Sequence, residues 1–187
     1  MKNEKIFWCK NCLNMSTRPR ITFDNRGWCS ACQWMEEKNT LDWTTREKEL
    51  DKLLNKYRSK DGTFDCITTV SGGKDGSYVS HVLKNKYKMN PLAITIRPAL
   101  AMKIGDDNLL NFIQSGFDHV HVSPNTKVLD RLNKYGFIEK GFPYYGWLMA
   151  LNTAVIKTAI SFKIPLVFYG ENGEIEYGGD TKFKNKA

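Results

Sequence analysis

The sequence predicts an α/β fold, a parallel sheet with helices on both faces, preceded by a small zinc-binding module. Two observations support this class. From residue 63 onward, short apolar and β-branched runs alternate with amphipathic segments, which is typical of β-α-β units with right-handed crossovers. Before residue 39, four of the five cysteines stand in two close pairs. The chain of 187 residues is long enough to bury one substantial core.

The chain divides into three predicted parts. Residues 1–38 hold the paired cysteines, residues 39–62 form a connecting amphipathic helix, and residues 63–187 form the α/β domain. In this domain, strands are expected at residues 65–70, 92–96, 119–122 and 166–169. Helices are expected between the first two strands and at about residues 106–115, 126–135 and 147–162. No strand or helix pattern follows residue 179, so either the domain closes earlier or the chain is a truncated piece of a longer protein.

A membrane span is not expected from the sequence. Apolar residues make up 41% of the chain and charged residues 26%, and no apolar run is long enough to cross a bilayer. The charged N-terminus lacks the apolar segment of a signal peptide, so a cytoplasmic location is expected. The formal net charge of +8 fits a nucleic acid, another polyanion such as a nucleotide or sugar nucleotide, or simply a solvated basic surface.

The paired cysteines have the spacing of a structural zinc site. Cys9 and Cys12 form one pair, Cys29 and Cys32 form the other, and residues 13–28 separate them. Each pair can bind one side of a metal ion from a tight turn, and the two turns complete a tetrahedron. Four thiolates leave no open coordination position, so a structural zinc is expected. The fifth cysteine, Cys66, falls inside the first strand and is expected to be a core thiol.

A glycine-rich loop, residues 71–77, joins the first strand to the following helix. Its glycines let the backbone turn sharply and approach a ligand, while the exposed N–H groups and the helix N-terminus attract an anion. Lys74 adds a positive charge, and Asp75 fits a Mg²⁺ ligand beside a pyrophosphate. The expected ATP-binding residues of the loop are Ser71, Gly72, Gly73, Lys74, Asp75 and Ser77.

The loop resembles the Ser-Gly-Gly-x-Asp-Ser signature of the PP-loop ATP pyrophosphatases, which cleave ATP between the α and β phosphates. It matches neither the Walker loop nor the dinucleotide-binding fingerprint. One position departs from the signature: Gly76 stands where the last serine is usual, and Ser77 can replace its hydroxyl. The resemblance implies that Lys74 and Asp75 act at the reacting phosphates.

Two further strand ends are expected at the edge of the sheet that carries this loop, because ligands of open α/β sheets bind beyond the carboxyl ends of strands. Thr95 and Ile96 end the second strand and are expected to contact adenine. Gly170 and Glu171 follow the last strand. Glu171 is a candidate catalytic residue that holds a second metal or the substrate, or else it belongs to a solvated acidic turn. The histidines are expected to be packing or surface residues: His81, His119 and His121.

Several further motifs occur in a fixed order along the chain. They are residues 8–12, 17–24 and 27–32 in the cysteine module, residues 42–43, 46–47, 56–58 and 65–67 before the loop, and residues 116–119 and 169–179 after it. Together with the loop, they resemble the N-acetyl sugar amidotransferase family of bacterial surface-polysaccharide (O-antigen and lipopolysaccharide) and flagellar-sugar pathways. Members of that family continue past the last motif, so the resemblance implies that the chain is an N-terminal half.

The resemblance implies a reaction with ATP, Mg²⁺ and a sugar nucleotide, in which an N-acetyl group becomes an acetamidino group. Ammonia would come from a partner glutaminase and a cyclase-like subunit, and no membrane or nucleic-acid partner is expected. Two alternatives stay open. The first is a tRNA-thiolating PP-loop enzyme, although only Cys66 is available in the α/β domain to carry sulfur. The second is a non-catalytic remnant or binding subunit.

Overall fold

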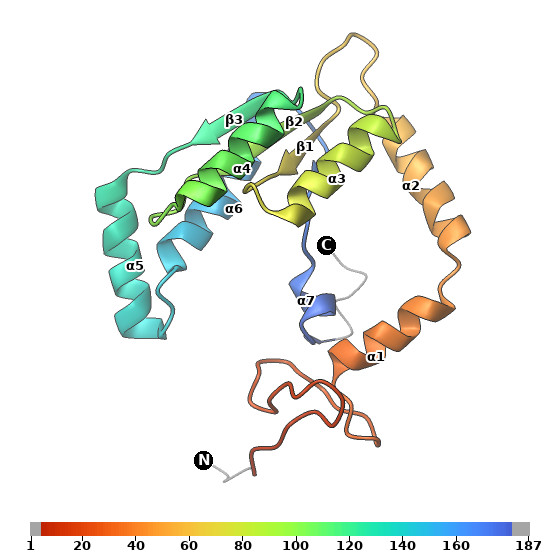
Figure 1. Ribbon diagram of the computed structural model, residues 1–187, viewed down its shortest axis with the longest axis vertical. Coiled ribbons are helices and arrows are strands. Elements are labelled where there is room, and N and C mark those ends of the chain that lie inside the picture. Colours follow the sequence, from red (N-terminus) through yellow and green to blue (C-terminus); the bar gives the residue numbers. More distant parts are fainter. Residues whose placement is uncertain (1–4, 181–187) are drawn as a thin grey trace. The chain divides into compact units, whose positions relative to one another are not determined.

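The computed structural model describes residues 5–180, and the chain forms two compact units (Figure 1). Among the described residues, one unit contains those up to Glu47 together with residues 171–180, and the other runs from Lys48 to Gly170. This division differs from the predicted three parts, because the residues after Gly170 group with the cysteine module. The reason is local packing: the short helix after Gly170 contacts the helix that begins after Cys29 and contains Cys32.

The unit from Lys48 to Gly170 is built on a parallel sheet with the strand order β3-β2-β1-β4. Its strands are β1 (Cys66–Thr69), β2 (Pro91–Ile96), β3 (His119–Val122) and β4 (Val167–Phe168). Ile67 of β1 pairs with Leu92 and Val167, and Ile94 pairs with Val120. The predicted strands are therefore confirmed, although only two residues of β4 pair with β1.

One face of the sheet is covered by α3 (Lys74–Asn85) and α4 (Lys103–Gln114), which follow β1 and β2 (Figure 1). Val70 and Ala93 pack there against Leu109 and Phe112 of α4, together with Phe117. A second group of buried side chains joins α2 (Trp43–Tyr57) to β1 and α3, and it consists of Leu54, Cys66, Leu83 and Met89. The apolar spacing that predicted α2 and α3 therefore corresponds in part to their buried faces, through Leu54 and Leu83, whereas Trp43 and Leu53 of α2 are exposed.

The other face is covered by α6 (Tyr145–Ser161), where Val155 and Ala159 pack against Ile67, Ile94 and Ile96. Helix α5 (Thr126–Lys140) precedes α6 and packs against it. Two glycines let these helices cross closely. A Cβ atom added at Gly146 would lie 2.9 Å from the Leu129 carbonyl oxygen, and one at Gly136 would overlap Tyr145. Helices on both faces of a parallel sheet confirm the predicted fold class.

The start of β1 is fixed by a buried carboxylate. Asp65 accepts hydrogen bonds from the backbone N–H groups of Ser59 and Asn90, the latter at 2.6 Å. The side chain of Arg58 donates to the carbonyl oxygens of Tyr87 and Lys88 at 2.8 and 2.6 Å. Both interactions join the end of α2 to the turn before β2. These hydrogen bonds hold the residue before β1 next to the residue before β2, and the loop follows at the other end of β1.

The other unit contains α1 (Ser30–Glu37), the 3₁₀ helix η1 (Lys38–Thr40) and α7 (Gly173–Glu176). Two isolated antiparallel bridges, Trp8 with Met15 and Phe23 with Cys29, shape the turns around the cysteines. Neither α1 nor α7 was predicted, because both are too short for an apolar period to be read. The backbone at Gly178 has φ +83°, and a Cβ atom there would lie 3.3 Å from Ala31 N.

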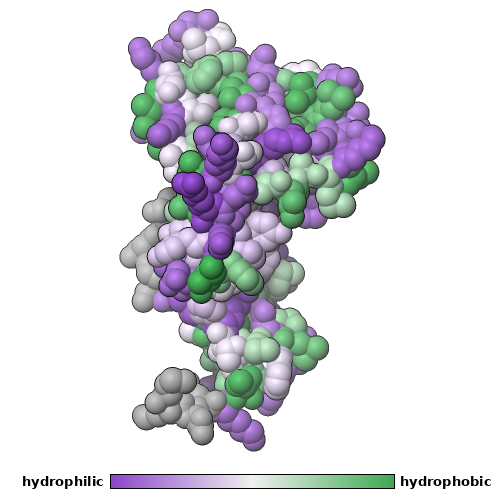
Figure 2. Space-filling view, turned by 90° about the vertical axis from the view of Figure 1, so that its left-hand side faces the viewer, coloured by the Kyte–Doolittle hydropathy of each residue, from purple (hydrophilic) through white to green (hydrophobic). Residues whose placement is uncertain are grey.

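No helix among residues 5–180 is long and apolar enough to cross a membrane. Hydrophilic and hydrophobic side chains are mixed on the face of the molecule that Figure 2 shows.

Candidate functional site

The glycine-rich loop lies where the sequence predicts it, between the end of β1 and the first turn of α3. Gly72 has φ +83°, and a Cβ atom there would lie 2.7 Å from the Gly105 carbonyl oxygen and 3.0 Å from Leu109 N of α4. Only glycine combines this backbone conformation with so close an approach. Gly73 is extended and caps α3, which begins at Lys74. The N-terminus of a twelve-residue helix therefore follows the loop directly.

The structure explains the departure from the signature at Gly76. A Cβ atom at this position would overlap the Thr69 carbonyl oxygen and lie 3.2 Å from Val70 Cα. The next position, Ser77, donates its hydroxyl to the Gly73 carbonyl oxygen at 2.7 Å. Gly170, at the end of β4, also approaches α3, because a Cβ atom there would lie 2.8 Å from Gly76 N. Three backbone segments thus meet at Gly76, and no side chain fits between them.

The two charged residues of the loop pair with each other. Lys74 Nζ lies 2.8 and 2.7 Å from the two carboxylate oxygens of Asp75. The Lys74 side chain is 87% exposed and the Asp75 side chain 47% exposed, so both can turn toward a ligand. Ser71 Oγ accepts a weak hydrogen bond from Gly73 N at 3.4 Å. The loop therefore presents a cation, a carboxylate and a hydroxyl beside a helix N-terminus.

An open groove of about 630 Å³ begins at this loop and runs between α3 and α4. Gly72, Gly73 and Lys74 line its end at the loop, and Phe112 and Phe117 lie among its other walls. Its remaining lining side chains are polar or aromatic and carry no carboxylate: Ser77, Tyr78, His81, Asn108, Asn111 and Ser115.

Thr95 and Ile96 lie at the carboxyl end of β2, as predicted, and both are buried. The Thr95 hydroxyl donates to the Val70 carbonyl oxygen at 2.5 Å, and the Ile96 carbonyl oxygen accepts the Trp147 indole N–H at 3.4 Å. The groups expected to contact adenine are thus engaged within the protein. The next residue, Arg97, is half exposed and lies 3.5 Å from Asp106 of α4.

Glu171 is exposed and begins the second segment of the unit that contains the cysteines. Gly170, its neighbour, is the last residue of the other unit. The structure therefore brings the loop residues, Thr95, Ile96 and Gly170 together in one unit, and it places Glu171 in the other.

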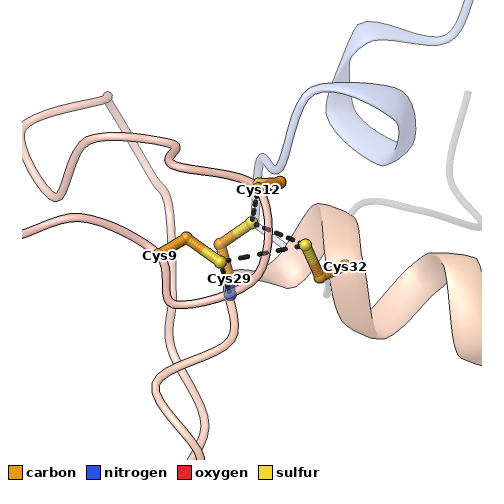
Figure 3. Close-up of side chains that lie close together, drawn as sticks. All are labelled: Cys9, Cys12, Cys29 and Cys32. Carbon is orange, nitrogen blue, oxygen red and sulfur yellow. Dashed lines mark hydrogen bonds between the residues drawn. The ribbon is translucent and has the colours of Figure 1, made fainter.

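The four paired cysteines converge on one point (Figure 3). Their sulfur atoms all lie within 4.8 Å of one another. The separations are 3.8 Å for Cys9 and Cys32, 3.5 Å for Cys12 and Cys29, and 3.7 Å for Cys29 and Cys32. Four Zn–S bonds of about 2.3 Å at tetrahedral angles place the sulfurs about 3.8 Å apart. The cluster therefore has the size of a tetrahedral zinc site.

The surroundings of the sulfurs also suit a metal. The backbone N–H groups of Asn11 and Cys29 donate to Cys9 Sγ at 3.4 and 3.2 Å. Burial raises the pKa of the Cys9 thiol, but backbone hydrogen bonds outweigh it and lower that pKa to about 6. Burial raises the pKa of Cys32 to about 12. A divalent cation removes the cost of holding several thiolates together, so these four cysteines can hold a zinc ion.

The remaining candidates have different surroundings. Cys66 is fully buried, and burial, with a smaller contribution from the charge of Asp65, raises its thiol pKa to about 12. The predicted core thiol is therefore confirmed. His119 was expected to be a packing or surface residue; it is partly buried, and its Nε2 atom also lies 2.8 Å from Thr95 Oγ1. Sequence reasoning missed this contact because residues 95 and 119 meet only through the pairing of β2 with β3.

Comparisons with known proteins give partial likenesses, and no family model matches the chain. An uncharacterized protein from Methanocaldococcus jannaschii is 30% identical over 104 residues, which is 55% of this chain. The matched stretch spans only 37% of that protein's length. A solved structure described as a predicted subunit of tRNA methyltransferase from the same organism is similar to 58% of this chain. That likeness covers 54% of the solved chain, with 22% identity and a TM-score of 0.41.

Proposed function

We propose that this chain is the ATP-binding part of an enzyme that adenylates an oxygen atom of its substrate and releases pyrophosphate. The observation that carries the proposal is the loop at residues 71–77, set between a central parallel strand and a helix N-terminus. The exposed loop suits an anion, and Lys74 adds an exposed positive charge. The same residues carry the resemblance to the PP-loop ATP pyrophosphatases.

In the proposed reaction, the substrate oxygen attacks the α-phosphorus of ATP, and pyrophosphate leaves. The loop N–H groups and Lys74 would stabilise the negative charge that develops on this leaving group. Lys74 pairs with Asp75, so ATP would compete with Asp75 for the ammonium group. Asp75 would then be free to hold Mg²⁺, which neutralises phosphate charge when bound. Glu171 stays a candidate for a second metal or substrate contact.

The acceptor that we favour is the N-acetyl amide of a sugar nucleotide, because the motifs outside the loop resemble the N-acetyl sugar amidotransferases. An amide oxygen is a poor leaving group, and adenylation converts it into AMP. Ammonia then attacks the carbon, AMP leaves, and an acetamidino group forms. A partner glutaminase with a cyclase-like subunit would supply the ammonia. The proposal places this reaction in the cytoplasm, as part of bacterial surface-sugar synthesis.

A tRNA is the second candidate acceptor, and it is the substrate class named for the similar solved structure. The observation on this chain that favours it is the net charge of +8, which suits a phosphate backbone. A thiolating reaction would need a cysteine to carry sulfur. Cys66 is an obstacle to that reaction, because a fully buried thiol of raised pKa is a poor sulfur carrier. A tRNA modification that uses adenylation without a cysteine avoids this obstacle.

The test is ATP-dependent release of AMP and pyrophosphate by the full chain, with either an N-acetylated sugar nucleotide plus ammonium or a tRNA as acceptor. Lys74→Ala is expected to lower the rate by about a hundredfold or more, the range for loss of one preorganised charge-stabilising group. Lys52→Ala, which removes the same charge from the exposed side of α2, is the matched control. If neither acceptor gives AMP at saturating ammonium, the chain is not an adenylating enzyme on its own.

A further inference from the structure

The Val70 carbonyl group, the Thr95 hydroxyl group and the His119 ring form a hydrogen-bonded chain next to the loop. Val70 directly follows β1, Thr95 belongs to β2 and His119 belongs to β3. The Thr95 hydroxyl lies 2.5 Å from the Val70 carbonyl oxygen, and His119 Nε2 lies 2.8 Å from the Thr95 hydroxyl oxygen. Thr95 is 5% exposed and Val70 is 4% exposed, so water cannot readily replace either partner. Val70 immediately precedes Ser71, the first residue of the loop.

The direction of each hydrogen bond follows from the available protons. A carbonyl oxygen only accepts, so the single hydroxyl proton of Thr95 must go to Val70. The hydroxyl oxygen then accepts from His119, which fixes a proton on Nε2 of that ring. Burial, and then the neighbouring His121, lower the pKa of His119, which agrees with a neutral ring.

The Val70 carbonyl determines the direction of the first amide of the loop. In a trans peptide the C=O and the following N–H point in opposite directions, and the described residues contain no cis peptide. The Val70 N–H is also fixed, because it donates to the Ile94 carbonyl oxygen at 2.9 Å. The N–H and the C=O of Val70 are therefore both hydrogen-bonded to residues of β2. With the carbonyl held toward Thr95, the Ser71 N–H must point away from β2.

From this geometry we propose that Thr95 and His119 are positioning residues, which hold the Ser71 amide in the direction that the bound phosphate requires. The inference rests on the proposed ATP-binding function of the loop. The Thr95 hydroxyl holds the Val70 carbonyl through a direct hydrogen bond. His119 does not contact Val70 through this chain but orients the Thr95 hydroxyl. A valine at position 95 has nearly the same shape as threonine and would leave the Val70 carbonyl without its partner. The peptide could then rotate and turn its carbonyl dipole toward the phosphate.

The experiment compares Thr95→Val with Thr95→Ser in the full chain, using Mg²⁺ and a non-hydrolysable ATP analogue in calorimetric titrations. Thr95→Val is expected to weaken binding about five- to tenfold, the effect of one lost hydrogen bond, and Thr95→Ser to keep it within about twofold. His119→Phe is expected to have a smaller effect than Thr95→Val, because Thr95 keeps its bond to Val70. Val155→Ala, in the core on the other face of the sheet, controls for general destabilisation.

Amide hydrogen exchange of the segment 69–77 provides a second measurement that needs no ligand. The inference predicts faster exchange in Thr95→Val than in Thr95→Ser or Val155→Ala. Unchanged exchange and unchanged analogue binding in Thr95→Val overturn the inference, and so does an equal loss of binding in Val155→Ala. If the wild-type chain does not bind the analogue at all, the proposed function fails, and the exchange comparison still decides whether Thr95 positions the loop.

Discussion

Two glycines at equivalent helix positions are expected to respond in opposite ways to the same substitution. Gly76 is the third residue of α3, Gly105 is the third residue of α4, and both helices are twelve residues long. A Cβ atom at Gly105 would meet nothing within 4 Å, whereas one at Gly76 would overlap the Thr69 carbonyl oxygen. The substitutions Gly76→Ala and Gly105→Ala therefore differ in steric surroundings and little else.

Two contributions to the free energy of unfolding determine the expected effect of each substitution. Replacing glycine by alanine in a helix gains roughly 0.5–1 kcal/mol, and this gain applies to both positions. Forcing a methyl group into an occupied site costs roughly 1–3 kcal/mol, and here the neighbours are backbone atoms of β1 that cannot rotate away. Gly105→Ala should therefore stabilise the chain by up to about 1 kcal/mol. Gly76→Ala should be about 1–3 kcal/mol less stable than Gly105→Ala.

The assay is urea or thermal unfolding of the two variants and the wild type, followed by circular dichroism. For a chain of this size, 1 kcal/mol corresponds to roughly 2–4 °C in the midpoint, so the two variants should be separated by about 2–12 °C. Gly76→Ser, which restores the serine of the signature, should behave like Gly76→Ala and should also weaken ATP binding. Equal midpoints for Gly76→Ala and Gly105→Ala would refute the close packing of α3 against the end of β1.

Further outcomes are expected for the four-cysteine cluster, for Cys66 and for Gly136. If the four cysteines hold zinc, adding a chelator to the zinc-loaded chain should speed amide exchange in both α1 and α7, whereas β2 and α6 keep their protection. Equal exchange in α7 with and without metal would contradict a metal-dependent module that includes this helix. Cys66→Ser should leave AMP release intact, and the native Cys66 thiol, with a pKa of about 12, should resist a thiol reagent at pH 8 because its thiolate is scarce far below that pKa. Labelling of Cys66 at the rate of a free thiol would exclude its burial. Gly136→Ala should cost roughly 1–3 kcal/mol in urea unfolding, because the added methyl group overlaps Tyr145 where α5 crosses α6.

Much of the fold could be predicted from the sequence, because strands and helices leave a local periodic pattern. The alternating segments after residue 63 predicted β1 to β4 and the helices between them. The spacing of the two cysteine pairs predicted a cluster that the structure closes to within 4.8 Å. The position of the glycine-rich loop between a strand and a helix was predicted for the same reason, since each of these signals lies within a few neighbouring residues.

The contacts between distant segments were decided only by the tertiary structure. The grouping of α7 with the cysteine module depends on contact between residues near 31 and near 178, which share no local pattern. The bond from Thr95 to Val70 depends on the pairing of β2 with β1. The sequence by itself therefore determined the elements, the loop and the four-cysteine cluster, because local spacing encodes them. Only the tertiary structure decided what surrounds each glycine and which side chains hold the loop, because those partners meet only when the chain folds.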